Sequence, residues 1–162
     1  MVGQVGERWD RPSPCGEWDA RGVLEHVIGF HDVLILVPLG VKPDRPRDDP
    51  MARWAVTAEA ISAVTEEDVT FPEGAEAAGY TRLFPLLTTD VLVHTWDLAA
   101  AVGLEVVLDP DLCAVALEGV QRNAEKIAAS GMFDPPVAVP PGSDVQSALV
   151  ALLGRDPRWG RP

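Results

Sequence analysis

The sequence predicts one all-α domain, residues 1–162, built as a bundle of helices. Apolar residues recur at helical spacing, three and four positions apart, in four long segments. Proline and glycine, 15 and 14 in number, fall mostly between these segments and separate them. Signals for β-strands are few, so four substantial helices around a shared core are the expected architecture.

The first two helices are expected at residues 20–37 and 50–66. Asp19 is the N-cap we expect for the first helix. The pair Asp49–Pro50 opens the second helix with a cap followed by proline at the first helical position. The inward-facing stripe of the first helix contains Val23, His26, Val27, Phe30 and Leu34.

Two further long helices follow in the second half of the chain. The third is expected at residues 83–102 and ends before Gly103, a residue type that favours the left-handed conformation after a helix. The pair Asp109–Pro110 repeats the signal of a cap followed by proline, and it opens a fourth helix that extends to Ser130.

The remaining segments are shorter. A short extended piece is expected at residues 69–71, and the proline-rich segment 135–141 must be extended because proline disfavours helix there. Ser143 and Gln146 have the spacing of a capping box, which predicts a last short helix over residues 143–153.

The charge balance excludes some classes of partner. The chain has 25 acidic and 13 basic residues and a formal net charge of −12. Binding to nucleic acid or to an anionic membrane needs a positive surface, so neither partner is expected. The N-terminus has no signal-peptide pattern, and the longest apolar run, residues 34–37, is far too short to span a membrane. We therefore expect a cytoplasmic protein.

The third helix carries the most informative polar side chains. Asp90 and His94 are four residues apart, so both project from one face of the helix about one turn apart. Asp97 lies three residues beyond His94 and roughly shares that face. The rest of this segment is nearly all apolar, as in a central helix, where a buried charge is costly unless it is paired or bound to metal. We interpret Asp97 as a residue that orients a ligand or pairs with an arginine.

A second histidine, His26, comes from the apolar stripe of the first helix. Helical bundles build metal sites from inward side chains on facing helices. His26, Asp90 and His94 would supply three ligands and leave other positions open, which is the pattern of a catalytic site. Nitrogen and carboxylate ligands suit Zn²⁺, Ni²⁺, Fe²⁺ or Mn²⁺, and the sequence does not choose among them. The alternative is a buried hydrogen-bond network without metal. His31 is expected at the surface or at the rim of the site.

Several segments resemble an actinobacterial protein family. They are DRPSPCGEWDARGVLEHVIG after Trp9, then LTTDVLVHTWDLAAAVGL, and the shorter FDPPVAVPP and ALLGRDPRW. The family is related to the N-terminal, metal-binding domain of the mycothiol-dependent maleylpyruvate isomerase. It belongs to the DinB/YfiT-like superfamily of four-helix bundles. The resemblance covers nearly the whole chain from Trp9 onward.

The resemblance implies a metal site and a reaction class. It implies a divalent metal held by one histidine of the second bundle helix and by a pair four residues apart on the third. In this chain these residues are His26, Asp90 and His94, with aspartate where the isomerase-like branch has glutamate. It further implies a transferase or isomerase that uses a small thiol, mycothiol, against a small electrophile. The alternative is a non-catalytic or vestigial bundle that binds a ligand or acts under stress without metal.

The resemblance also implies a full helix before Trp9, where this chain has only eight residues. We therefore expect a DinB-like four-helix bundle whose first helix is mostly missing. The remaining helices would expose an apolar groove, and such a groove favours association of two copies into a homodimer.

Overall fold

The computed structural model describes residues 1–16, 18–66 and 77–160, and every regular element in them is helical. This confirms the all-α prediction. The extended piece expected at residues 69–71 lies outside the described residues. The elements are η1 (Val2–Gln4), α1 (Ala20–His31), η2 (Asp32–Leu36), α2 (Pro50–Glu66), α3 (Ala77–Ala101), α4 (Pro110–Arg122), α5 (Ala124–Ser130) and α6 (Val145–Leu152).

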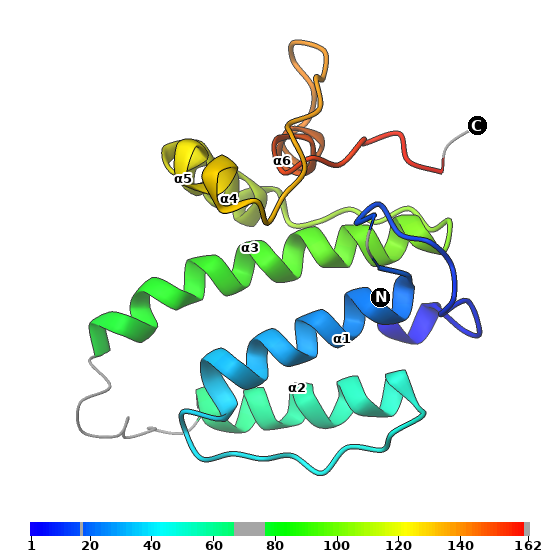
Figure 1. Cartoon of the computed structure of the whole chain (residues 1–162), viewed down its shortest axis with the longest axis vertical. Coiled ribbons are helices and arrows are strands. Elements are labelled where there is room, and N and C mark those ends of the chain that lie inside the picture. The colour runs from blue at the N-terminus through cyan, green and yellow to red at the C-terminus, as the bar shows by residue number, and fades with distance from the viewer. Residues whose placement is uncertain (17, 67–76, 161–162) are drawn as a thin grey trace.

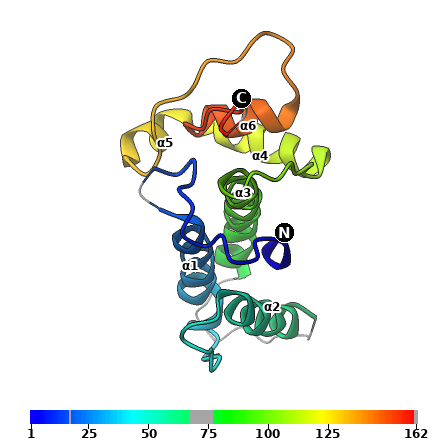
Figure 2. The same ribbon diagram turned by 90° about the vertical axis from the view of Figure 1, so that its right-hand side faces the viewer.

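Helix α3 runs through the middle of the molecule (Figure 1). Helices α1 and α2 lie on one side of it, and α4, α5 and α6 lie on the other. In the perpendicular view α1 and α3 are seen almost end-on, and the N-terminal η1 lies close to α2 and α3 (Figure 2). Three sides of a helical bundle are therefore formed by α1, α2 and α3, and the short η1 stands at the fourth.

The side of α3 that faces α1 and the side that faces α4 and α6 are both buried, because a separate cluster of apolar side chains covers each of them. One cluster joins α3 to α4 and α6 and includes Val93, Cys113 and Leu149. Another joins α3 to α1 and the N-terminal segment and includes Val23 and Leu98. Burial on opposite sides explains why the sequence of α3 is apolar almost all round.

The first predicted helix begins as expected but does not continue regularly to residue 37. Asp19 is the N-cap, with a carboxylate oxygen that accepts the Gly22 N–H at 2.7 Å. After His31 the backbone widens into the π-helical turn η2, in which the Val37 N–H donates to the Asp32 carbonyl oxygen. Periodicity does not reveal such a turn, since its apolar residues Ile35 and Leu36 still face the core while Val33 faces solvent.

The third predicted helix begins six residues earlier than expected, at Ala77 rather than residue 83. Pro85 lies inside it. An interior proline removes a backbone donor and its ring crowds the carbonyl four residues earlier, at a cost of about 3 kcal/mol. Helix α3 nevertheless continues through Pro85. The predicted starts of α2 and α4 at Pro50 and Pro110 are correct, because in both an aspartate cap precedes the proline.

The predicted fourth helix is divided at Asn123, so a single helix from 110 to 130 was wrong. The Asn123 side-chain amide donates to the Gly119 carbonyl oxygen at 2.9 Å, and its backbone leaves the helical conformation. Short polar side chains often compete with the helix backbone in this way. The expected end is correct, because Gly131 has a left-handed φ of 67°.

The predicted capping box at the last helix was also wrong. Asp144, not Ser143, is the N-cap of α6, and its carboxylate accepts the Ser147 N–H. Gln146 is used elsewhere: its amide accepts the Leu108 N–H and donates to the Val106 carbonyl oxygen. Of the segment 135–141 expected to be extended, residues 135–140 contain no helix or turn, and Pro141 begins a turn.

No helix in the described ranges has both the length and the apolar composition that crossing a membrane requires.

Candidate metal centre

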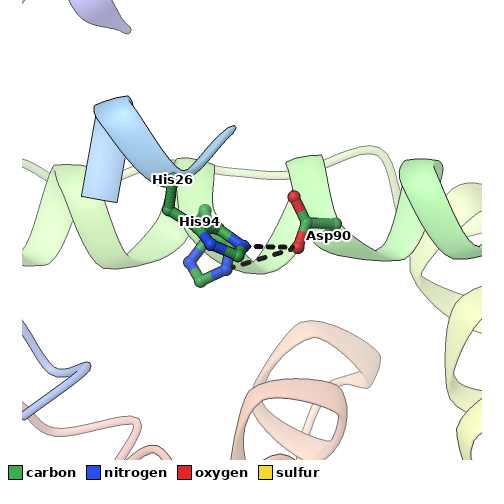
Figure 3. Close-up of side chains that lie close together, drawn as sticks. All are labelled: His26, Asp90 and His94. Atoms are coloured by element: carbon green, nitrogen blue, oxygen red, sulfur yellow. Dashed lines mark hydrogen bonds and ion pairs between the residues drawn. The ribbon is translucent and has the colours of Figure 1, made fainter. Parts of the chain in front are cut away.

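The three residues expected to bind metal lie together between α1 and α3. His26 lies in the middle of α1, whereas Asp90 and His94 are one turn apart on the facing side of α3 (Figure 3). One potential ligand atom from each lies within 4.8 Å of the others. The stripe on α1 and the four-residue spacing on α3 therefore meet, because the two helices pack along each other.

Both imidazole rings point at one carboxylate oxygen. Nε2 of His26 lies 3.2 Å from Oδ1 of Asp90, and Nε2 of His94 lies 3.4 Å from the same oxygen. In the part of the chain that the structure describes, the second oxygen, Oδ2, is buried without a hydrogen-bond partner. An unsatisfied buried carboxylate oxygen is costly, and a cation would satisfy it.

The electrostatics of the cluster favour the charged forms of Asp90 and His94. Burial alone would raise the pKa of Asp90, but hydrogen bonds from His26 and His94 outweigh it and lower the pKa to about 2. Burial alone would lower the pKa of His94, but hydrogen bonds to Asp90 and Asp97 outweigh it and raise the pKa above 6.5. Both shifts have one cause, since each charge is stabilised by an opposite charge in contact with it.

Asp97 contacts the other ring nitrogen of His94. Its Oδ2 lies 2.9 Å from Nδ1 of His94, and its carboxylate is bonded through both oxygens to Arg155. It thus makes both contacts that the sequence suggested for it, one with a candidate ligand and one with an arginine.

The contact with Asp97 determines which nitrogen of His94 can bind a metal. An ionised carboxylate only accepts hydrogen bonds, so the Nδ1–H of His94 donates to Asp97. In the neutral ring, Nε2 then carries a lone pair that faces the negative Asp90 oxygen. A positive group between them, either a proton or a metal ion, removes this repulsion. The donor set and Oδ2 of Asp90, which has no partner among the described residues, therefore fit a divalent cation.

Aromatic rings surround His26. Trp18 stacks on it with ring centroids 4.5 Å apart, and Phe30 stacks with centroids 5.6 Å apart. Trp18 also lies 5.8 Å from the ring of His94. A hydrophobic surrounding of this kind limits the access of water to a metal site.

Sequence reasoning missed two residues of the site and misplaced one. Trp18 belongs to the loop before α1, and Arg155 is 58 residues from Asp97, so no local spacing connects either to the cluster. His31 was expected at the surface or at the rim of the site but is buried, with Nδ1 at 2.7 Å from the Val27 carbonyl oxygen. The prediction failed because α2 covers a second side of α1, where the rings of His31 and Trp54 form a T-shaped pair with centroids 6.5 Å apart.

The fold and the site together define a class: an all-helical protein with a cluster of two histidines and an aspartate between two packed helices. No family model matches the chain, and no solved structure matches it. Two proteins of Mycobacterium tuberculosis do match. They are the uncharacterized protein Rv0738 of strain ATCC 25618 / H37Rv and the uncharacterized protein MT0763 of strain CDC 1551 / Oshkosh. Each is 32% identical over 163 residues, covering 91% of this chain and 85% of the relative. The chain belongs to the family of these mycobacterial proteins.

Proposed function

We propose that this protein binds a divalent metal ion through His26, Asp90 and His94 and acts in the cytoplasm as a thiol-dependent transferase or isomerase. Mycothiol is the proposed thiol, and a small electrophile is the proposed second substrate. One observation carries the proposal: two histidine nitrogens converge on a buried carboxylate whose other oxygen has no partner among the described residues.

The donor set suits catalysis better than a purely structural role. Three protein ligands leave coordination positions for other molecules, whereas structural zinc sites are usually closed by four. A bound divalent ion would lower the pKa of a coordinated thiol, so that the thiol is a thiolate nucleophile at neutral pH.

The residues of the chain have separate parts in this proposal. His26 and His94 offer neutral nitrogen donors, and Asp90 offers a charge that the cation offsets. Asp97 keeps the Nε2 of His94 available, while Trp18 limits the access of water beside His26. The mycobacterial source of the relatives agrees with mycothiol, the thiol that the sequence resemblance implies.

Elemental analysis of the purified full chain tests the metal. We expect close to one divalent ion per chain, and we expect His26→Ala and His94→Ala to lose it. The matched control is His31→Gln, because His31 is also a buried histidine on α1 but contacts none of the three residues. Full metal content in both alanine variants would contradict the proposed site.

A thiol-transfer assay with mycothiol tests the reaction. We expect conjugation of a reactive model electrophile by the metal-loaded protein with mycothiol, and less with glutathione. No difference between the metal-loaded protein and its His94→Ala variant would contradict the proposed activity, and the elemental analysis would still decide the metal site.

A metal-free binding protein is the second candidate. It is favoured by the 3.2 Å hydrogen bond between His26 and Asp90, which partly satisfies the cluster without an ion. Thermal melts with and without EDTA separate the two candidates. A metal present at a thousand times its dissociation constant stabilises the native state by about 4 kcal/mol. That corresponds to a rise in Tm of roughly 8–16 °C for a chain of this size. An unchanged Tm would favour the metal-free candidate.

A further inference from the structure

A buried ion pair connects the C-terminal part of the chain to His94. Asp97 has no exposed surface, and Arg155 is 5% exposed. Nε of Arg155 donates to Oδ1 of Asp97 at 3.2 Å, and Nη2 donates to Oδ2 at 2.9 Å. The same Oδ2 accepts the Nδ1–H of His94. The three side chains therefore form a continuous chain of charge-assisted hydrogen bonds that ends at a candidate metal ligand.

Other residues of the C-terminal part of the chain hold the guanidinium group of Arg155 in place. Nη1 donates to the Leu153 carbonyl oxygen at 2.8 Å, and the group lies over the ring of Phe133 with 5.6 Å to its centroid. Its backbone N–H donates to the carbonyl oxygen of Val150 at the end of α6. Arg155 is thus fixed at both its backbone and its side chain, and it can hold the Asp97 carboxylate in one orientation.

We propose that Arg155 is a positioning residue for the metal centre and acts through Asp97 on His94. This inference rests on the proposed metal site. Arg155 orients Asp97, Asp97 accepts the Nδ1–H of His94, and Nε2 is thereby left free to bind metal. Metal-ligating histidines commonly donate their second ring N–H to a carboxylate, and loss of such a partner typically weakens metal binding about 10- to 100-fold. The C-terminal part of the chain is therefore needed for tight metal binding.

A second ion pair in the same chain provides a matched control. Arg45 donates to both oxygens of Asp32 at 2.9 Å and 2.6 Å, and its Nε donates to the buried Thr57. This pair joins η2 to the segment that precedes α2, and Arg45 reaches α2 only through Thr57. Neither residue of the pair contacts a candidate metal ligand. It is also an ion pair between an arginine and an aspartate, although its side chains are 10% and 27% exposed. It makes no contact that leads to His94.

Co²⁺ binding to the full chain, followed by its visible absorption, tests the inference. The main variant is Asp97→Leu/Arg155→Met, which removes both charges and so leaves no unpaired buried charge. We expect its Co²⁺ affinity to fall about 10- to 100-fold with a changed absorption spectrum. Arg155→Lys keeps the charge without the two-pronged geometry, and we expect a smaller loss. The control Asp32→Leu/Arg45→Met should keep wild-type affinity and spectrum.

The outcomes separate this inference from the proposed function. Wild-type Co²⁺ affinity and spectrum in folded Asp97→Leu/Arg155→Met would show that the pair is only structural, and the metal site would stand. A wild-type chain that binds no Co²⁺ would overturn both. If circular dichroism shows that the double variant does not fold, the near-isosteric Asp97→Asn decides by the same criterion.

Discussion

His94 is the residue on which the cluster depends, because each of its ring nitrogens contacts a carboxylate. In the metal-free protein these contacts raise the pKa of His94, and the resulting stabilisation is complete below its ordinary pKa of 6.5. It is lost as the pH rises through the higher pKa of the folded state. Metal binding needs the neutral ring, so acid should release the metal.

Asp90 predicts the opposite dependence for the metal-free protein. Its pKa is lowered from 3.8 to about 2, so its contribution is complete above the ordinary pKa and is lost as the pH falls towards 2. The shift corresponds to about 2 kcal/mol. Between about pH 5 and pH 2, urea denaturation of the EDTA-treated wild type should therefore lose about 2 kcal/mol more than Asp90→Asn. Parallel curves for the two proteins would count against this ionic stabilisation.

At the residue scale, the backbone conformation of Gly154 predicts a loss of stability when the residue is substituted. Its φ is +85°, and a Cβ there would lie 2.6 Å from the Asp134 carbonyl oxygen. We expect Gly154→Ala to lower the free energy of unfolding by more than about 2 kcal/mol, through both conformation and collision. The control is Gly142→Ala, with φ +83° but with no atom of the described residues, apart from its chain neighbours, within 4 Å of the new Cβ. We expect it to cost about 1 kcal/mol. If both variants lose the same free energy of unfolding in chemical denaturation, the close approach to Asp134 does not affect stability.

At the scale of elements, helix starts were more predictable than helix interiors. The three aspartates Asp19, Asp49 and Asp109 cap the helices that follow them, because a short side chain with an acceptor satisfies the first free N–H groups. The π-turn after His31 and the break at Asn123 were not predicted. Both depend on local hydrogen bonds that leave the apolar pattern unchanged.

The N-cap of α6 predicts that substitutions of the adjacent residues Ser143 and Asp144 lower the free energy of unfolding by different amounts. The pKa of Asp144 is lowered by hydrogen bonds from the backbone and hydroxyl of Ser147, so its stabilisation diminishes as the pH falls below the ordinary value of 3.8. Asp144→Ala should lower the free energy of unfolding at neutral pH by about 1 kcal/mol. Ser143→Ala, at the cap position expected from the sequence, should lower it by less. The reverse order in thermal or urea denaturation would restore Ser143 as the cap.

At the scale of the whole molecule, the side of the bundle next to η1 is only partly filled. An apolar pocket lies between η1, α1, α2 and α3, with Met1, Val2, Trp54 and Val91 in its walls. Burial of such a surface against a second copy would stabilise both chains. The pocket agrees with the homodimer expected from the sequence, which stays a prediction.

Light scattering at high protein concentration tests the dimer. We expect twice the chain mass of 17.4 kDa. Val2→Glu places a charge in the wall of the pocket and should shift the mass towards the monomer. The control Val107→Glu, at a valine that is 93% exposed and outside the pocket, should leave the mass unchanged. A monomeric wild-type mass would rule the dimer out under these conditions.

The sequence alone determined the all-α class, the starts of α1, α2 and α4, and the three residues that meet at the candidate metal site. These features depend on local periodicity and capping, which act within a few residues along the chain. Asp90 and His94 share a face because they are four residues apart, and His26 joins them because its apolar stripe must face a neighbouring helix.

Only the tertiary structure decided what surrounds that site. It buried His31 under α2, stacked Trp18 on His26, and brought Arg155 to Asp97 across 58 residues. Contacts of this kind follow from how whole elements pack, and packing depends on the shape and volume of side chains far apart in the sequence. The position of a ligand is thus readable from helical spacing, whereas the residues that orient it are set by the assembled fold.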